Sequence, residues 1–477
     1  MKIAVLRFTP ADQQAFARLA GDFNPIHLDP VAARRVAAGA PIVHGVHLLL
    51  RALDAHFKDH APAGHLTVTA AFRRPALPGD SIAVMRTGAR RLALTVDRAE
   101  PLVEIGLEPN RRRDQPRPDD ECVDGTAHLT GHPATKPRAR SWNEIQHAQG
   151  ELGLNRGRAP RRAFPHVARV LSGDAVAAMA AVSRLVGMEC PGRDSLLSAV
   201  RLDVTADAPA TRLRWRVARV DARFGKVRID IDSGCVRGTV EAFLTPRPAP
   251  LPSIDAAAGK VAPGEFAAQR AVILGGSRGI GAATAMLVAA GGGVPLVTFA
   301  AGAAEVRTLA RDAANAGRRI EKMRFDVLTG SFDLLARAAR RFGATHLYYF
   351  ATPRIFARRR EPFDDDLFRL FTTFYVTAFA KACAAVANGP LAVFFPSSTA
   401  LDHPRRELTE YIAAKAAGEA LAAALPPALP GTQMLVRRLP RISTDQTASI
   451  VPQHALDPVD AMLPIVREMH RLIGGAR

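Results

Sequence analysis

Apolar and polar residues follow two different patterns along this chain. From about Phe266 onward, short apolar runs typical of buried strands alternate with stretches of helical periodicity. The expected strands are Ala271–Leu274, Val294–Phe299, Leu347–Phe350 and Leu391–Pro396. Strands that alternate with helices predict a parallel sheet covered by helices.

The part before Phe266 shows a different order, in which helices precede strands with alternating apolar positions. Phe16, Leu19 and Ala20 predict a first helix, and the apolar run Val46–Leu53 predicts a second. Further along, Leu213–Val217 and Val227–Asp232 alternate as half-buried strands do. The looser likeness between the first two segments is weak evidence of an ancient doubling.

Two stretches predict linkers because they are poor in bulky apolar residues. Residues 109–121 are rich in Pro and charge, and residues 246–264 in Pro, Ala and Gly. A chain of 477 residues is also too long for a single core. The predicted division is a domain at 1–108, a linker at 109–140, a second unit at 141–246, a linker at 247–265 and a domain at 266–477.

The formal charge of +19 raises the question of a nucleic-acid partner. The basic residues are mostly Arg spread through every segment, and clusters such as Arg111–Arg113 and Arg358–Arg360 lie near acids without interleaved aromatics. We therefore expect solvated basic faces and no nucleic-acid binding. A positive field would still favour an anionic ligand or an acidic partner.

Composition also predicts the cellular compartment of the protein. Its four cysteines, Cys122, Cys190, Cys235 and Cys383, have neither disulfide-framework nor zinc-ligand spacing. No run offers the roughly 18 apolar residues that a membrane helix needs, and the N-terminus lacks a signal-like apolar region. We expect a cytoplasmic protein without metal or membrane contact.

The first candidate site lies between Asp22 and His27. Asn24-Pro25 breaks the preceding helix and fixes the approach of His27 to Asp22. A carboxylate and an imidazole held close together can add water to an enoyl thioester, one group taking a proton and the other giving one. Gly45, at the start of the apolar helix, offers an N–H to the developing oxyanion. The alternative is that Asp22 caps the helix and His27 only anchors a turn.

These residues resemble the R-specific enoyl-CoA hydratase or MaoC-like dehydratase family. The family's GDxNPxH motif is matched by Gly21, Asp22, Asn24, Pro25 and His27, its (I/V)xHG stretch by Ile42–Gly45, and its later strand and turn by Phe72, Pro75, Pro78, Gly79 and Asp80. The resemblance covers about the first 108 residues. It implies a hot-dog fold with Asp22 and His27 as the catalytic pair.

Residues 141–246 resemble a second, degenerate hot-dog unit at the level of fold alone, so that the two units together would form a double hot dog. They contain no Asp/His pair of their own. Ser195 or Ser198 could touch substrate, but we favour local hydrogen bonding of both hydroxyls.

The second candidate site begins with Ala271–Gly281, which reads AVILGGSRGIG. A strand runs into glycines that permit close approach to a pyrophosphate, and a helix then begins. The predicted cofactor-binding residues of this loop are Gly275, Ser277, Arg278, Gly279, Ile280 and Gly281. A lone glycine motif would be weak evidence.

The motif is strengthened by Ser398, Tyr411 and Lys415, which have the Ser…YxxxK spacing of the short-chain dehydrogenase/reductase (SDR) family. Lys415 follows Tyr411 by one helical turn and so lies on the same face, where its charge lowers the pKa of the phenol. The resemblance implies an α/β Rossmann fold with a doubly wound parallel sheet, a catalytic Tyr411, a substrate-binding Ser398 and a ribose-binding Lys415. Asp326 looks like the family's adenine-contacting Asp, and the resemblance thus adds Asp326, Val327, Tyr411 and Lys415 to the predicted cofactor-binding residues.

The residues around the loop favour NADP(H) over NAD(H). The strand Val294–Phe299 is followed by Ala300 and Ala301, so no acid is present to bind a ribose 2′-hydroxyl. Arg278 lies in the glycine loop, where it could meet a 2′-phosphate.

The chain departs from the SDR pattern at three places. Phe350-Ala351-Thr352-Pro353 replaces NNAG, Phe374 stands where an active-site Asn is common, and Pro440-Arg441 replaces Pro-Gly, with Ser443 and Thr444 as candidate substitutes. A domain that binds cofactor but is catalytically weak is therefore the alternative.

The two sites together predict a bifunctional acyl-thioester enzyme, because a 3-hydroxyacyl thioester is common to both reactions. We expect 3-ketoacyl reduction with NADPH followed by reversible dehydration, acting on acyl-CoA or on an acyl carrier protein thioester. The alternatives are the degradative direction and a thioester-binding assembly module without turnover. Both families commonly associate, so a homo-oligomer is also expected.

Overall fold

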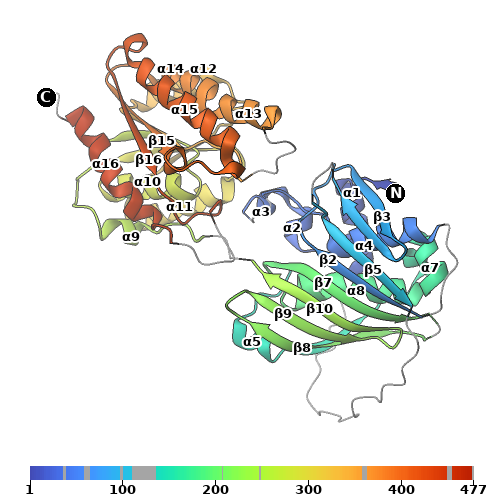
Figure 1. The fold of residues 1–477 in the computed structure, drawn as a ribbon. Coiled ribbons are helices and arrows are strands. Elements are labelled where there is room, and N and C mark those ends of the chain that lie inside the picture. The colour runs from blue at the N-terminus through green and yellow to red at the C-terminus, as the bar shows by residue number, and fades with distance from the viewer. Residues whose placement is uncertain are drawn as a thin grey trace. The chain divides into compact units, whose positions relative to one another are not determined.

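The computed structural model describes residues 1–35, 39–58, 65–96, 100–109, 136–206, 208–245, 249–356, 363–447 and 454–474. These residues form two compact units, an N-terminal unit up to residue 245 and a C-terminal unit from residue 249 (Figure 1). Most of the predicted linker 109–140, Cys122 and the cluster Arg358–Arg360 lie outside the described residues.

The N-terminal unit is built on one ten-stranded sheet. Its first half contributes β1 (Lys2–Leu6), β2 (His65–Phe72), β3 (Ile82–Gly88), β4 (Arg91–Thr95) and β5 (Val103–Pro109). Its second half contributes β6 (Gln149–Gly153), β7 (Ser195–Thr205), β8 (Arg212–Asp221), β9 (Lys226–Asp232) and β10 (Val236–Leu244).

The two halves of this sheet have the same strand order. The full order is β1-β3-β4-β5-β2-β7-β10-β9-β8-β6, and the halves join where β2 pairs antiparallel with β7. Counted outward from that junction, each half presents its second, fifth, fourth, third and first strand. The double hot-dog interpretation stays a prediction, and this repeated order is what a duplicated unit would have.

The helices of the N-terminal unit bury one face of the sheet. They are α1 (Pro10–Ala20), α2 (Pro25–Leu28), α3 (Pro30–Ala33), α4 (Gly45–Phe57), α5 (Trp142–Gln146), α6 (Arg158–Ala163), α7 (Pro165–Leu171), α8 (Gly173–Arg184) and the π-helical η1 (Leu185–Glu189). The apolar residues of α4 and α8 join the core with alternate strand residues such as Val227, Ile229 and Ile231. The period of two in β9 therefore matches a sheet with one buried face.

The described residues of the C-terminal unit form a six-stranded sheet, in which all neighbouring strands pair in parallel. They are β11 (Arg270–Leu274), β12 (Val294–Phe299), β13 (Glu321–Arg324), β14 (His346–Tyr349), β15 (Leu391–Ser398) and β16 (Thr432–Leu439). The order β13-β12-β11-β14-β15-β16 is that of a doubly wound Rossmann sheet. The four strands expected from the apolar runs are present, each within a few residues of the predicted bounds.

Helices cover both faces of this parallel sheet, which explains why its central strands are continuous apolar runs (Figure 1). One face is covered by α9 (Ile254–Ala258), α10 (Gly279–Ala290), α11 (Ala303–Asn315) and α16 (Pro458–Gly474). The other is covered by α12 (Phe332–Phe342), α13 (Asp365–Thr372), the π-helical η2 (Thr373–Ala378), α14 (Phe379–Val386) and α15 (Thr409–Ala424). The short 3₁₀ turns are η3 (Thr399–Leu401), η4 (Arg406–Leu408) and η5 (Pro426–Ala428).

The segment predicted as the second linker contains ordered structure in its described part. Helix α9 lies within it, and Ile254 and Ala257 are buried against α10. This part of the segment therefore belongs to the core of the C-terminal unit.

Within the described residues, no single helix has both the length and the apolar character needed to cross a bilayer. The bent pair formed by α7 and residues Gly173–Glu189, at 114° to each other, meets that requirement only when its two parts are added together.

Candidate active sites

Local sequence brings Asp22 and His27 together. Helix α1 begins with a capping box between Thr9 and Asp12 and ends at Gly21, whose φ of 75° lies in the left-handed region that glycine tolerates. The side chain of Asn24 then accepts a hydrogen bond from the N–H of Ile26, which starts the short helix α2. The chain thus reverses within a few residues and presents His27 to Asp22.

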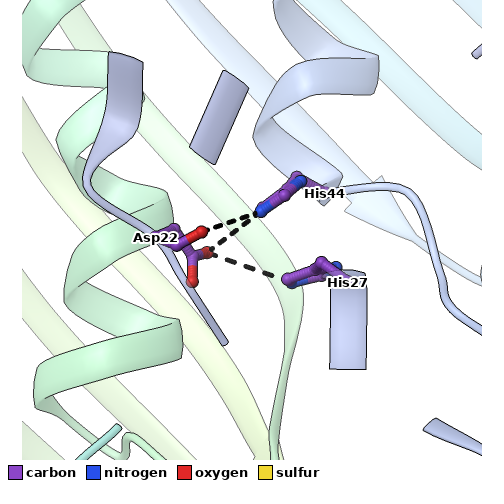
Figure 2. Close-up of side chains that lie close together, drawn as sticks. All are labelled: Asp22, His27 and His44. Carbon is purple, nitrogen blue, oxygen red and sulfur yellow. Dashed lines mark hydrogen bonds and ion pairs between the residues drawn. The ribbon is translucent and has the colours of Figure 1, made fainter. Parts of the chain in front are cut away.

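The Asp22 carboxylate is buried and faces two buried imidazoles (Figure 2). The Nε2 atoms of His27 and His44 each lie 3.9 Å from Asp22 Oδ2. The His27 Nδ1–H donates to the carbonyl of Ile42 at 2.8 Å, which leaves its Nε2 as the proton-accepting nitrogen toward Asp22. This is an arrangement in which one proton can be taken and another given within a single small space.

The sequence analysis did not assign a role to His44, although it lies in the (I/V)xHG stretch. The His44 ring stacks on His27 with centroids 3.8 Å apart, and its Nδ1 lies 2.8 Å from Gln13 Oε1. His44 therefore supports the His27 imidazole from one side.

Gly45 is the first residue of α4, as the sequence predicted. Its N–H consequently lies at the positive end of the helix. A Cβ at this position would lie 3.2 Å from the Phe72 ring and 3.3 Å from the Leu197 side chain. Glycine therefore permits the side chains of Phe72 and Leu197 to pack closely around this N–H.

Burial sets the protonation behaviour of the pair. Burial raises the pKa of Asp22, while His27, the Ser183 hydroxyl and the Asn24 N–H oppose this effect. Burial lowers the pKa of His27, although Asp22 opposes the effect, and lowers that of His44 well below its usual value. At neutral pH the imidazoles are thus neutral, and the two pKa values of the pair approach each other, as acid–base catalysis requires.

Asp22, His27 and His44 are also ligand types for a divalent metal, and their ligand atoms lie within 4.8 Å of one another. The two rings, however, are stacked at only 24° to each other. Nitrogen lone pairs lie in the ring planes, so stacked rings direct them along nearly parallel lines instead of toward one ion. The geometry favours proton transfer over metal binding.

The second half of the N-terminal unit also contacts the Asp22 carboxylate. The Ser183 hydroxyl donates to Asp22 Oδ2 at 2.7 Å, a contact that sequence reasoning missed. Of the serines considered from the sequence, Ser195 donates to the carbonyls of Val186 and Gly192, as expected. The Ser198 hydroxyl, contrary to expectation, is buried without a hydrogen-bond partner.

In the C-terminal unit, the glycines of the loop after β11 are required by close backbone contacts. Gly275 has φ of 79°, and a Cβ there would lie 2.8 Å from the carbonyl carbon of Phe350. A Cβ on Gly281 would lie 2.5 Å from the Gly275 oxygen. Because α10 begins at Gly279 directly after the loop, its N-terminal amides are directed at the space where a Rossmann fold holds a pyrophosphate.

The remaining residues predicted to bind cofactor surround this loop. Ser277 is buried within the loop, and Ile280 follows at the start of α10. Asp326 helps to line a hollow of about 310 Å³ that Ala300 also borders, and Val327 is buried beside it. Arg278, in contrast, donates to Asp445 Oδ2 at 3.2 Å, so that its guanidinium is already held by a carboxylate.

The predicted catalytic residues of this unit do lie together. Tyr411 and Lys415 are neighbours on one face of α15, and Ser398 ends β15. The Ser398 hydroxyl bonds the Tyr411 hydroxyl and lowers the pKa of this phenol, but burial dominates and raises it. Lys415 Nζ donates to the carbonyl of Pro396 at 2.6 Å.

Tyr375 is a further residue of this site that the sequence analysis missed. Lys415 Nζ lies 3.9 Å from the centre of the Tyr375 ring, and the Tyr375 hydroxyl lies 2.6 Å from that of Thr352. Phe374, which the sequence comparison with SDRs pointed to, instead accepts a hydrogen bond from Tyr349 through its carbonyl. Tyr375 is thus a residue of η2 that contacts Lys415.

The buried lysine has a measurable consequence for stability. Burial lowers the pKa of Lys415 to about 7, against about 10.5 for an exposed lysine. Below about pH 7 the ammonium is charged in both the folded and unfolded states, so folding bears the full cost of burying it. Between about pH 7 and pH 10.5 the folded protein holds a neutral Lys415, while the unfolded chain still holds a charged one. The cost of removing that proton on folding falls as pH rises and vanishes near pH 10.5, where the unfolded chain loses its proton as well.

We therefore expect Lys415→Met to raise the free energy of unfolding at pH 7, by an amount on the order of 3 kcal/mol. The difference between the variant and the wild type should disappear as pH approaches 10.5. Urea denaturation of both proteins, followed by circular dichroism at several pH values, measures it. A difference that is equal at every pH would contradict a lysine with a depressed pKa.

Comparison with known proteins gives matches in both parts of the chain. The model of the MaoC like domain matches residues 3–91. Peroxisomal multifunctional enzyme type 2 of Drosophila melanogaster is 40% identical over 105 residues, which are 21% of this chain and 17% of that protein. The (R)-specific enoyl-CoA hydratase of Aeromonas caviae is 39% identical over 80 residues, which are 16% of this chain and 58% of that protein.

Among solved structures, a short chain dehydrogenase of Salmonella enterica serovar Typhi is 18% identical, with a TM-score of 0.39, and the match covers 44% of this chain and 93% of that one. The chain thus spans 17% and 58% of the two sequence relatives above.

Fold and sites together define a chain that joins a hot-dog domain to a Rossmann domain. The hot-dog domain is MaoC-like, as its GDxNPxH motif indicated. The Rossmann domain has the doubly wound parallel sheet that the SDR resemblance implied, and it brings Ser398, Tyr411 and Lys415 together.

Proposed function

We propose that this chain is a bifunctional acyl-thioester enzyme. Its N-terminal site interconverts 3-hydroxyacyl and 2-enoyl thioesters, and its C-terminal site interconverts 3-ketoacyl and 3-hydroxyacyl thioesters with NADP(H). The observation that carries the proposal is the buried Asp22–His27 pair within a MaoC-like domain. The names of the two sequence relatives, a multifunctional enzyme and an enoyl-CoA hydratase, agree with it.

In hydration, the Asp22–His27 pair serves as base and acid. One member removes a proton from water as its oxygen attacks the β-carbon, and the other supplies a proton to the α-carbon. Negative charge collects meanwhile on the thioester oxygen, where the Gly45 N–H and the N-terminus of α4 stabilise it. Dehydration uses the same groups in reverse.

In reduction, bound NADPH would supply the hydride to the ketone carbon. The Tyr411 hydroxyl gives its proton to the carbonyl oxygen, which Ser398 holds by a hydrogen bond. The charge of protonated Lys415 favours the phenolate that Tyr411 becomes in this step. Burial of the lysine among aromatic rings strengthens this effect, since water does not screen it.

We favour NADP(H) because β12 is followed by Ala300 and Ala301 instead of an acid. Arg278 would bind a 2′-phosphate by sharing or exchanging its bond with Asp445. The hollow beside Asp326 is the space we assign to the adenine.

The glycine loop offers a direct test of cofactor binding. In Gly281→Ala the new Cβ would lie 2.5 Å from the Gly275 oxygen, so the loop has to move away from the pyrophosphate position. We expect NADPH to bind at least about tenfold more weakly. The matched control is Gly259→Ala, where the nearest atom is 3.7 Å from the Cβ. Titration of NADPH fluorescence measures both variants, and unchanged affinity in Gly281→Ala would exclude this loop as the binding site.

The hydratase site is tested without any cofactor. Crotonyl-CoA incubated with the purified chain should yield (R)-3-hydroxybutyryl-CoA, detected by loss of the enoyl absorbance and by chiral analysis of the product. The absence of turnover with crotonyl-CoA and with longer 2-enoyl-CoA thioesters would contradict the proposal.

A further inference from the structure

The hollow of about 310 Å³ beside Asp326 lies at the carboxyl ends of β12 and β13. Ala300, which directly follows β12, and Arg324, the last residue of β13, both border it. The two strands pair in parallel, with Arg324 opposite Phe299. The hollow is therefore placed where a Rossmann fold receives the adenosine part of a dinucleotide, at the carboxyl edge of its sheet.

One side of this hollow suits a flat, amino-bearing base. The Asp326 carboxylate accepts a hydrogen bond from the Leu328 N–H through Oδ1 at 2.9 Å, which fixes its orientation. Leu334, on α12, is 52% exposed and borders the same hollow, so it offers an apolar surface to the face of a base. These features account for adenine binding but not for a choice between the two nicotinamide cofactors.

The charges around the hollow bear on that choice. Among the described residues that line it, Asp326 is the only acid and Arg324 the only base. Arg324 is exposed, and within the described part of the chain no carboxylate pairs with it. Glu321, on the same strand, pairs instead with Arg319 at 2.7 Å. Arg324 thus presents a guanidinium, whose planar set of N–H donors matches a phosphate group.

The arginine of the glycine loop is in a different situation. Arg278 donates to Asp445 Oδ2 at 3.2 Å, and the other oxygen of this carboxylate accepts the Ala249 N–H at 2.8 Å. Asp445 is 8% exposed, so its negative charge is poorly screened by water. A phosphate that approaches Arg278 therefore meets the repulsion of Asp445 as well as the attraction of the guanidinium.

We infer that Arg324 is the main specificity-determining residue of the reductase site, which binds the 2′-phosphate of NADP(H) from the end of β13. This inference rests on the proposed reductase function. Arg278 contributes less, because Asp445 has to share it with the phosphate. The small side chains of Ala300 and Ala301 leave the end of β12 without a group that would repel the phosphate or fill its space.

Arg324→Gln tests the guanidinium, since it removes the charge and keeps most of the side-chain length. We expect the dissociation constant of NADPH to rise about tenfold to a hundredfold, while that of NADH changes less than about twofold. Lys322→Gln is the matched control, because it removes an exposed cation from the same strand outside the lining of the hollow. It should leave both dissociation constants unchanged. Fluorescence titrations of the full chain measure them, and circular dichroism checks folding.

The double variant Arg278→Gln with Asp445→Asn tests the loop arginine. It removes the ion pair without changing the net charge of the protein, so no unpaired carboxylate is left beside the cofactor. We expect the ratio of the NADH and NADPH dissociation constants to change less than about threefold, which is a smaller effect than that of Arg324→Gln.

The outcomes separate the inference from the function on which it rests. A loss of NADPH affinity alone in Arg324→Gln, with a smaller effect of the double variant, supports the inference. Equal weakening of NADH and NADPH overturns it, because Arg324 would then contact the part that both cofactors share. Unchanged NADPH affinity in Arg324→Gln also overturns it and leaves the reductase function intact. A wild type that reduces 3-ketoacyl thioesters with neither cofactor overturns the proposed function itself.

Discussion

His27→Ala should lower the rate of enoyl-CoA hydration by about 10²- to 10⁴-fold and leave NADPH-dependent reduction of a 3-ketoacyl thioester unchanged. The variant removes the Nε2 atom that faces Asp22 at 3.9 Å, so one of the two proton transfers loses its group. The tautomer fixed by the Ile42 carbonyl is lost with it. Steady-state rates with crotonyl-CoA and, separately, with acetoacetyl-CoA and NADPH measure the two sites in one preparation.

The exposed His147 provides a control for this variant, since His147→Ala removes an imidazole from the protein surface. It should leave both activities at the level of the wild type. Loss of reduction together with hydration in a folded His27→Ala protein would contradict two independent sites. Full retention of hydration would assign His27 to the anchoring of the turn alone.

Tyr411→Phe should reduce 3-ketoacyl reduction by at least about 10²-fold while NADPH still binds. The substitution keeps the ring that packs against Phe371 and Tyr375 and removes only the hydroxyl that gives the proton. Because our proposal assigns cofactor binding mainly to the glycine loop and Lys415, the dissociation constant of NADPH should change little. Single-turnover oxidation of NADPH and a fluorescence titration separate these two quantities.

Tyr375→Phe is the companion variant for this experiment. It keeps the ring beneath Lys415 and removes the hydroxyl that bonds Thr352. Most of the reductase activity should remain, since this hydroxyl does not transfer a proton to substrate. Equal activity in Tyr411→Phe and the wild type would remove Tyr411 from the mechanism and leave a domain that binds cofactor without this chemistry.

The part of each site that sequence could predict is the part made by local structure. Asp22 and His27 are separated by a turn whose shape follows from its own residues. Gly45 begins a helix that the apolar residues after it predict. Tyr411 and Lys415 are four positions apart on one helix, so their common face follows from helical geometry. The parallel sheet could also be predicted from sequence, because its central strands are continuous apolar runs.

The residues that sequence missed depend on packing between distant segments. Ser183 reaches Asp22 from 161 positions away, and no local pattern marks it. Tyr375 was missed because it contacts Lys415 from η2, a π-helical turn, and the periodicity of a regular helix does not predict which side such a residue faces.

Arg278 illustrates a different limit of sequence reasoning. Its place in the glycine loop was evident, but its partner Asp445 comes from the segment after β16 and is 167 positions away. A guanidinium that sequence shows as available for a phosphate is thus already paired in the fold. Helix α9 is a comparable case, since its Ala-rich composition matched a linker although Ile254 and Ala257 are buried.

The most direct test of two linked sites is mass analysis of the purified chain incubated with acetoacetyl-CoA and NADPH. We expect both 3-hydroxybutyryl-CoA and crotonyl-CoA to form, the second only after the first. His27→Ala should stop the reaction at 3-hydroxybutyryl-CoA, and Tyr411→Phe should form neither product. Formation of crotonyl-CoA by the His27→Ala variant, or of 3-hydroxybutyryl-CoA at the full rate by Tyr411→Phe, would contradict the account.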